Sequence, residues 1–431
     1  MRYYSLNHNA PRVSFAEAAV KGQAPDKGLY FPERIPSLPQ GFIENIKQYS
    51  KEEIGLTVMK PYVGGSIADN ELQRIVNETI NFEFPLVPIT DSIASLELFH
   101  GPTLAFKDVG ARFMSRCLGY FNRNSNEQVT VLVATSGDTG GAVANGFLGV
   151  EGVNVVILYP SGKVSPVQEL QLTTLGQNIT ALEVQGTFDD CQAMVKQAFA
   201  DADLNNKLSL TSANSINVAR WLPQQLYYFF AYQQWQHTSA PVICVPSGNF
   251  GNICAGILAH VSGLPVTHFI AACNANDVVP QYIQSGQYQP KQAVATISNA
   301  MDVGNPSNFI RILELFHQQF NELKNKMSSV SVDDATTTKT IKDVFQQHHY
   351  TLDPHGAVAY YALDQYLQQH MADKGFILET AHPVKFPDTV EEATQQKIAI
   401  PESVQYLLHL QKQSITMPPI FDALKEWLMN R

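Results

Sequence analysis

The fold of this chain is decided by the stretch Pro241-Val242-Ile243-Cys244-Val245-Pro246-Ser247-Gly248-Asn249-Phe250-Gly251-Asn252. Its apolar first half predicts a buried β-strand, and its glycine-containing second half predicts a turn that opens a helix. Two glycines let the backbone aim its N–H groups at one point, where a helix N-terminus adds partial positive charge. The turn has neither the Gly-Lys-Ser/Thr of a Walker loop nor dinucleotide-binding spacing. It is therefore interpreted as a phosphate-binding loop or as a plain strand-to-helix turn.

Other apolar runs show the same order of strand, glycine-rich turn and helix. Val129–Ala134 leads into Ser136-Gly137-Asp138-Thr139-Gly140-Gly141, a second loop whose backbone donors suit a carboxylate or phosphate. A capped helix start explains this loop equally well. Further strands are predicted at residues 154–159, 179–184, 266–272 and 375–379. The alternation predicts an α/β protein with parallel sheet, in which a ligand lies at the carboxyl ends of the strands.

The chain is predicted to have three parts. Residues 1–90 are expected to form a mostly helical N-terminal region, because Ser14 and Glu17 have capping-box spacing and several prolines follow. Residues 91–395 are expected to form an α/β core of two subdomains. Residues 396–431 are expected to form a C-terminal helical segment.

Composition excludes several classes of partner. The net charge of −10 disfavours nucleic-acid binding and acidic membranes, which require basic surfaces, although a local pocket can still hold a small anion. No apolar run is long enough to span a membrane. The 5 cysteines are scattered, and the N-terminal residues lack the apolar run of a signal peptide. We therefore expect reduced thiols and a cytoplasmic protein. The histidines have no ligand spacing, so no metal site is predicted.

One lysine is placed for chemistry, in the stretch Phe99-His100-Gly101-Pro102-Thr103-Leu104-Ala105-Phe106-Lys107-Asp108. Lys107 stands at the head of a predicted helix, behind a Gly-Pro turn and beside an aromatic residue. Apolar packing and the positive end of the helix dipole both disfavour an ammonium ion, so this amine should lose its proton easily. Such an amine can attack a carbonyl and form a Schiff base. For a lysine considered by itself, a surface residue in a first helical turn is the expected interpretation, and only the other motifs of the chain argue against it.

Two further motifs are candidates for binding. Asn217 and Arg220 are three residues apart, so on a helix they share a face, and the guanidinium suits a phosphate or carboxylate. A capped helix with an exposed arginine is the alternative. Thr380 follows a predicted strand, where its hydroxyl can hydrogen-bond a ring nitrogen. His382 precedes a proline and is interpreted as structural.

Taken in order, residues 99–108, 136–141, 214–220, 247–252 and 380–386 resemble the threonine synthase family, in its form with an extended N-terminal region. The resemblance extends over nearly the whole chain. It implies the tryptophan-synthase β-like fold of pyridoxal-phosphate enzymes, fold type II, in which two open α/β domains flank the cofactor. The implied reaction converts O-phospho-L-homoserine and water to L-threonine and phosphate by γ-elimination and β-hydration, the last step of threonine biosynthesis. Oligomeric state does not follow from it.

The resemblance also implies roles for individual residues. Lys107 is expected to carry pyridoxal 5'-phosphate and to act as the catalytic base, and Thr380 is expected to face the pyridine nitrogen. The cofactor phosphate is expected at Ser247, Gly248, Asn249, Phe250, Gly251 and Asn252. Substrate is expected at Ser136, Gly137, Asp138, Thr139 and Asn217. Because the leaving phosphate needs cations, its expected partners are Arg112, Lys163 and Arg220.

Two alternatives stay open at this point. A serine or threonine dehydratase of the same fold shares the lysine and the phosphate loop but needs no site for a substrate phosphate. The basic residues Lys163 and Arg220 therefore favour the synthase. A catalytically silent relative that binds phosphorylated ligands and regulates a partner is the second alternative. It has no need of the nucleophile Lys107.

Overall fold

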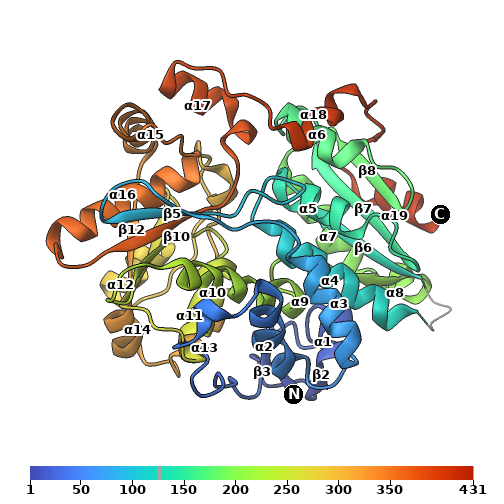
Figure 1. Ribbon diagram of the computed structural model, residues 1–431. Coiled ribbons are helices and arrows are strands. Elements are labelled where there is room, and N and C mark those ends of the chain that lie inside the picture. The colour runs from blue at the N-terminus through green and yellow to red at the C-terminus, as the bar shows by residue number, and fades with distance from the viewer. Residues whose placement is uncertain (124–127, 431) are drawn as a thin grey trace.

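The computed structural model describes residues 1–123 and 128–430, and its two larger sheets lie on opposite sides of the molecule (Figure 1). A six-stranded sheet has the order β12-β11-β10-β13-β5-β4, and only β4 runs antiparallel to its neighbour. Its strands are β4 (Leu86–Pro88), β5 (Ile93–Glu97), β10 (Val242–Pro246), β11 (His268–Cys273), β12 (Met327–Ser331) and β13 (Gly375–Glu379). The strands expected at residues 266–272 and 375–379 are confirmed as β11 and β13.

A five-stranded parallel sheet has the order β14-β8-β7-β6-β9. Its strands are β6 (Val129–Ala134), β7 (Val153–Pro160), β8 (Ile179–Val184), β9 (Ser209–Thr211) and β14 (Ile415–Met417). The predicted bounds of β6 and β8 are confirmed to the residue, because a buried parallel strand is a short run of β-branched residues. The edge strand β14 was not predicted, since its three residues carry no comparable apolar run.

Helices pack against the two larger sheets and against one another. They are α4 (Lys107–Asn122), α5 (Asp138–Phe147), α6 (Pro166–Thr173), α7 (Phe188–Ala200), α8 (Ala202–Lys207), α9 (Val218–Trp221), α10 (Gln225–Gln234), α11 (Gly251–Val261), α12 (Val278–Ser285), α13 (Phe309–Leu315), α14 (Phe320–Lys326), α15 (Asp334–His348), α16 (Pro354–Gln369), α17 (Pro387–Thr394), α18 (Glu402–Gln405) and α19 (Phe421–Met429). Alternate residues of β10 enter different cores: Ile243 and Val245 pack into one, and Val242 and Cys244 into another. This alternation buries the strand on both faces. In the described residues, no helix combines the length and apolarity that a membrane crossing requires.

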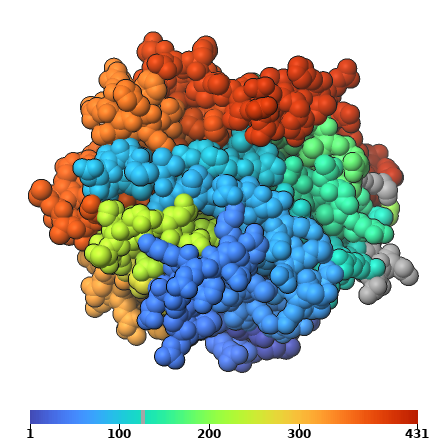
Figure 2. All heavy atoms as spheres, in the orientation of Figure 1, coloured from blue at the N-terminus to red at the C-terminus, as the bar shows by residue number. Residues whose placement is uncertain are grey.

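The N-terminal region packs against the rest of the chain around α4. It consists of β1 (Arg2–Ser5), β2 (Val13–Ser14), α1 (Phe15–Lys21), β3 (Tyr30–Pro32), α2 (Lys51–Val63) and α3 (Asp69–Thr79). The capping box predicted from Ser14 and Glu17 is confirmed at the start of α1. The small antiparallel sheet β2-β1-β3 was not anticipated, because its strands are too short to show a period. This region (blue) covers the lower part of the face drawn in Figure 2.

Candidate active site

Lys107 and Thr380 are brought together by backbone hydrogen bonds. The segment that leads from β5 into α4 pairs with the residues that follow β13: Phe106 N–H donates to Thr380 O at 2.9 Å, and Ala105 forms an isolated bridge with Ala381. Lys107 is the first residue of α4, as predicted, and Thr380 is buried at the carboxyl end of β13. In the described residues, the Thr380 hydroxyl has no hydrogen-bond partner within the chain. The two residues therefore lie on adjacent segments beyond the carboxyl ends of β5 and β13.

The amine of Lys107 lies in a poorly solvated, positively charged environment. Its Nζ is 5.8 Å from the centre of the Phe106 ring. Burial is the main reason why the pKa of Lys107 lies below its usual value, and the cations Lys385 and Arg220 lower it further. The Asp138 carboxylate acts in the opposite direction. An amine in this setting gives up its proton more readily than an exposed lysine does.

The loop Ser247–Asn252 forms a cradle of backbone donors before α11. Phe250 has a left-handed conformation with φ of 62°, and an added Cβ on Gly248 would lie 2.6 Å from the Cα of Met301. Among the described residues, the N–H groups of residues 248–252 have no acceptor in the chain. Because buried amides normally have a partner, a row of free amides at a helix N-terminus fits an anion such as a phosphate.

The side chains of this loop are used to shape it. Asn249 donates to Ser215 Oγ at 2.6 Å and accepts from Ser307 N–H at 2.6 Å, and Asn252 donates to Pro246 O at 2.8 Å. Ser247 Oγ donates to Val245 O at 2.9 Å. These contacts leave the backbone amides as the groups that are available to a ligand.

The loop Ser136–Thr139 offers a second, smaller set of donors at the start of α5. Thr135 Oγ1 accepts from Gly137 N–H at 3.0 Å and from Gly140 N–H at 2.8 Å, which fixes the turn. The N–H groups of Ser136, Asp138 and Thr139 have no acceptor in the part of the chain that the structure describes. This arrangement suits a carboxylate or a phosphate oxygen.

Asp138 forms a buried ion pair that the sequence did not indicate. Lys385 Nζ lies 2.8 Å from Asp138 Oδ1, and the Lys385 side chain is 0% exposed. Gln168 Nε2 donates to the same oxygen at 2.9 Å. Burial alone would raise the pKa of Asp138, but Lys385 and the nearby Lys107 hold that pKa well below its usual range. The only sequence signal was the position of Lys385 inside the stretch 380–386, between apolar residues.

Arg220 is buried close to α4, the helix that begins at Lys107. Its backbone oxygen and Nε lie against Gly110 in α4, where an added Cβ would be 2.7 Å from the oxygen. The guanidinium donates to Ala213 O, its Nε has no partner among the residues that the structure describes, and burial lowers the pKa of Arg220 to about 10. A buried guanidinium with a free donor is suited to bind an anion.

Three residues that were expected to bind substrate, Asn217, Lys163 and Arg112, have other surroundings in the structure. Asn217 caps α9, because its Oδ1 accepts from Ala219 N–H at 2.9 Å. Its Nδ2 donates to Ala19 O of α1 at 2.8 Å, which connects the two helices. Lys163 is exposed and has no hydrogen bond or ion pair from its side chain among the described residues. The structure therefore does not bring either side chain into the group around Lys107.

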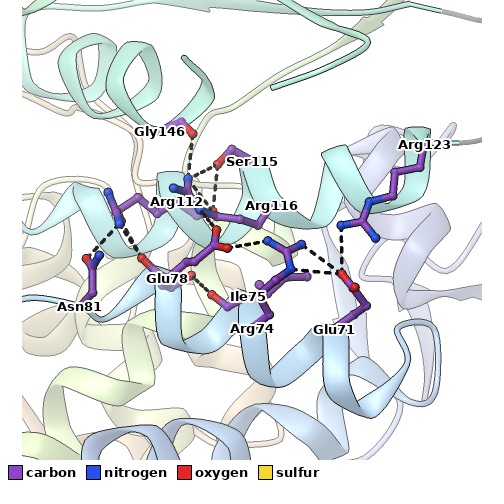
Figure 3. A network of polar contacts seen from close by, with 11 residues as sticks. Glu71, Arg74, Ile75, Glu78, Asn81, Arg112, Ser115, Arg116, Arg123 and Gly146 are labelled. Carbon is purple, nitrogen blue, oxygen red and sulfur yellow. Dashed lines mark hydrogen bonds and ion pairs between the residues drawn. The ribbon is translucent and has the colours of Figure 1, made fainter. Parts of the chain in front are cut away.

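The guanidinium of Arg112 points toward Glu78 and Asn81 of the N-terminal region (Figure 3). Arg112 donates to the carbonyl oxygen of Glu78 and to Asn81 Oδ1. It lies five residues after Lys107 on α4, and therefore on a different face of the helix. Spacing along the sequence could not show this, because helix faces are assigned by the partners that cover them.

The fold and the amide cradle define a class, the pyridoxal-phosphate-dependent enzymes of fold type II. The cradle has the free donors that a phosphate requires, Lys107 presents an amine in a poorly solvated position, and the Thr380 hydroxyl is an unpartnered donor nearby. A family model described as a pyridoxal-phosphate dependent enzyme matches residues 91–379. Models for the N terminus and the C-terminal part of threonine synthase match residues 2–80 and 356–427. The chain belongs to the threonine synthase family, which confirms the fold class, the enzyme class and the cofactor expected from its sequence.

Individual threonine synthases are similar to this chain over nearly their full length. The chain is 43% identical to threonine synthase from Serratia marcescens, with 100% of this chain and 99% of the relative covered. The crystal structure of threonine synthase from Escherichia coli has 42% identity and a TM-score of 0.92, with both chains covered to 100%. A structure of PLP-bound threonine synthase from Brucella melitensis has 34% identity and a TM-score of 0.94, covering 100% of this chain and 99% of the other.

Proposed function

We propose that Lys107 is the catalytic lysine of the threonine synthase reaction in this chain, the conversion of O-phospho-L-homoserine and water to L-threonine and inorganic phosphate. The observation that supports this most is the position of Lys107. Its amine has a lowered pKa and stands at the head of α4, on the segment that pairs with Thr380. No other described lysine combines the start of a helix with that neighbour.

The residues that hold the cofactor are proposed from their free donors. The amides of residues 248–252 would bind its phosphate, and Thr380 would offer a hydroxyl to the ring nitrogen. A hydroxyl cannot neutralise a full positive charge on that nitrogen as a carboxylate would, which favours elimination chemistry over a long-lived carbanion. When bound, the cofactor supplies an electron sink for charge that develops on the substrate.

Proton transfer is assigned to Lys107. With substrate in place, the free Nζ would remove a proton from Cα and then one from Cβ, so that the γ-phosphate can leave with the electrons of its C–O bond. Return of one proton to Cγ would form the methyl group, and water would supply the hydroxyl at Cβ as the second proton returns to Cα. The amides of Ser136, Asp138 and Thr139 would hold the substrate carboxylate, and Arg220 is the cation proposed for the leaving phosphate.

The proposal is tested by labelling and by turnover. Borohydride reduction of the holoenzyme followed by peptide mapping is expected to place a pyridoxyl group on Lys107. Lys107→Ala is expected to lose turnover of O-phosphohomoserine by about 10²- to 10⁴-fold or more, measured as threonine and phosphate release. Lys397→Ala, an exposed lysine paired with Glu391, is the matched control and should retain turnover. A label on another lysine would overturn the assignment. Ketoacid from serine or threonine without phosphohomoserine turnover would identify a dehydratase.

A cytoplasmic location and a small-molecule partner are also part of the proposal. The cysteines support a reducing compartment, because Cys117, Cys191, Cys244, Cys254 and Cys273 are all free and buried. The net charge of −10 supports a protein that does not bind nucleic acid. Thiol titration of the native and unfolded protein checks the first point, since the free thiols should react only after unfolding.

A further inference from the structure

The ion pair between Lys385 and Asp138 joins the two halves of the site. Asp138 opens α5, after β6 of the five-stranded sheet, whereas Lys385 ends the 3₁₀ turn Pro383–Lys385, which follows β13 of the six-stranded sheet. The two side chains are 7% and 0% exposed. Isolating two charges from water carries a desolvation cost that such a pair barely recovers. A pair of this kind at a reaction site therefore calls for a functional reason.

Lys107 supplies that reason, because it is the other cation close to Asp138. The charged groups that face Lys107 are Asp138 from α5, Lys385 from the 3₁₀ turn and Arg220 from α9. Asp108, the next residue on α4, is occupied elsewhere, since Oδ2 accepts from Thr103 N–H at 2.9 Å and Oδ1 accepts from the Thr103 hydroxyl. Asp138 is thus the one carboxylate in this set that is placed to hold Lys107 as an ammonium ion.

We propose that Lys385 is a positioning residue that occupies the Asp138 carboxylate and so leaves the amine of Lys107 free to lose its proton. The inference rests on the catalytic role proposed for Lys107. Lys385 acts in two ways at once. It neutralises the charge that would attract a proton to Lys107, and it adds a second cation that repels one. Gln168, which donates to the same carboxylate oxygen at 2.9 Å, keeps Asp138 turned toward Lys385.

The proposal makes opposite predictions for the two partners. In Lys385→Gln, Asp138 loses its cation and turns its charge to Lys107, so the pKa of Lys107 should rise by about one unit, a tenfold loss of reactive amine at neutral pH. In Asp138→Asn, the attracting charge is gone while Lys385 stays, so the pKa should fall. In the double variant K385Q/D138N both charges are absent, and the pKa should lie between those of the single variants. Lys385→Arg should retain the wild-type value.

The measurement is made on the apoenzyme, so that it does not depend on turnover. Competitive acetylation with a trace of acetic anhydride from pH 6 to pH 10, followed by peptide mass spectrometry, gives the titration of each lysine. The exposed Lys397 serves as the internal reference in every sample. Circular dichroism and thermal unfolding show that each variant is folded before its titration is compared.

The result expected is a higher pKa in K385Q and a return toward the wild-type value in the double variant. An unchanged or lower pKa in K385Q would overturn the proposal. If K385Q does not fold because it leaves a buried unpaired carboxylate, the comparison of D138N with wild type decides, and an unchanged pKa there also overturns it. Failure of the catalytic assignment is seen separately, as a pyridoxyl label on another lysine.

Discussion

Single residues at this site differ in whether their polar groups already have partners. Both ends of the Asn217 amide have partners within the chain, whereas Arg220 Nε and the backbone amides of residues 248–252 have none in the described part of the chain. A free buried donor carries a cost that only a ligand or water removes. The difference separates residues that build the site from residues that are left for a ligand.

The cradle leads to a prediction for Gly248. Gly248→Ala places a methyl group 2.6 Å from Met301 Cα and 3.0 Å from Ala300 O, so the loop has to move. The backbone N–H groups of the loop then no longer point toward one position. We expect the Kd for pyridoxal phosphate to rise by about tenfold or more, which corresponds to a loss of about 1.4 kcal/mol or more of binding free energy. Equilibrium dialysis of the apoenzyme measures this change.

The matched control is Gly119→Ala, in the last turn of α4. The added methyl group there meets only Val150 Cγ1 at 3.0 Å, and alanine is the better helix former. Cofactor affinity should be unchanged in this variant. Equal affinities of wild type and Gly248→Ala would show that the loop does not hold the phosphate.

Much of this site could be predicted from the sequence, and the rest could not for a definite reason. The strand β6, the start of α4 at Lys107 and the glycine loop follow from local patterns of apolar and small residues. The pair of Asp138 with Lys385 joins residues 247 positions apart, and no local pattern encodes it. The individual ligand assignments and the three-part division of the chain stay predictions.

At the scale of elements, a lysine of the C-terminal segment adds two ion pairs to the pairing of β14 with β8. Lys412, just before β14, lies 2.7 Å from Glu183 of β8 and 2.7 Å from Glu169 of α6. Burial alone would raise the pKa of Glu183, but the hydrogen bonds from Lys412 and two serines hold it at about 2. The edge strand therefore pairs with β8 next to a carboxylate that is charged throughout the physiological range.

This pKa has a consequence for stability. Because the folded-state pKa of Glu183 is depressed, its contribution is fully present above about pH 4.5 and is lost as pH falls toward 2. Glu183→Gln should lower the free energy of unfolding by about 1–3 kcal/mol at pH 7, and by less at pH 3. Urea unfolding at the two pH values measures this. Glu392→Gln, an exposed residue, is the control, and an equal loss at both pH values would contradict the assignment.

At the scale of the whole molecule, a network of arginines joins the N-terminal region to α4, the helix that begins at Lys107 (Figure 3). Arg116 of α4 donates to Glu78 of α3 at 3.2 Å and to Gly146 O of α5 at 2.9 Å. Arg123 pairs with Glu71 at 3.0 Å nearer the surface. The network links α3, α4 and α5, so the helices that begin at Lys107 and Asp138 are held by residues of the N-terminal region.

The two arginines differ in how much they should contribute. Arg116→Ala leaves a buried carbonyl and a carboxylate without their donor, which should cost about 1–3 kcal/mol of unfolding free energy. Arg123→Ala removes an exposed ion pair, 47% exposed on the arginine side, and should cost about 0–1 kcal/mol. Chemical denaturation of the two variants makes the comparison. Equal losses of unfolding free energy would show that the contacts of Arg116 contribute no more than an exposed ion pair does.

The order of strands along the chain has a consequence for synthesis on the ribosome. Strands β6 to β9 are contiguous, from residue 129 to residue 211, whereas the other large sheet combines β5 with β10 to β13 and so needs residue 379. Four strands of the five-stranded sheet can thus assemble while the later strands of the six-stranded sheet are still being translated. The outer edge of the five-stranded sheet, β8, stays bare until residues 415–417 leave the exit tunnel. A nascent chain stalled before that point therefore exposes the unpaired edge of a parallel strand, which is a site for association with neighbouring chains.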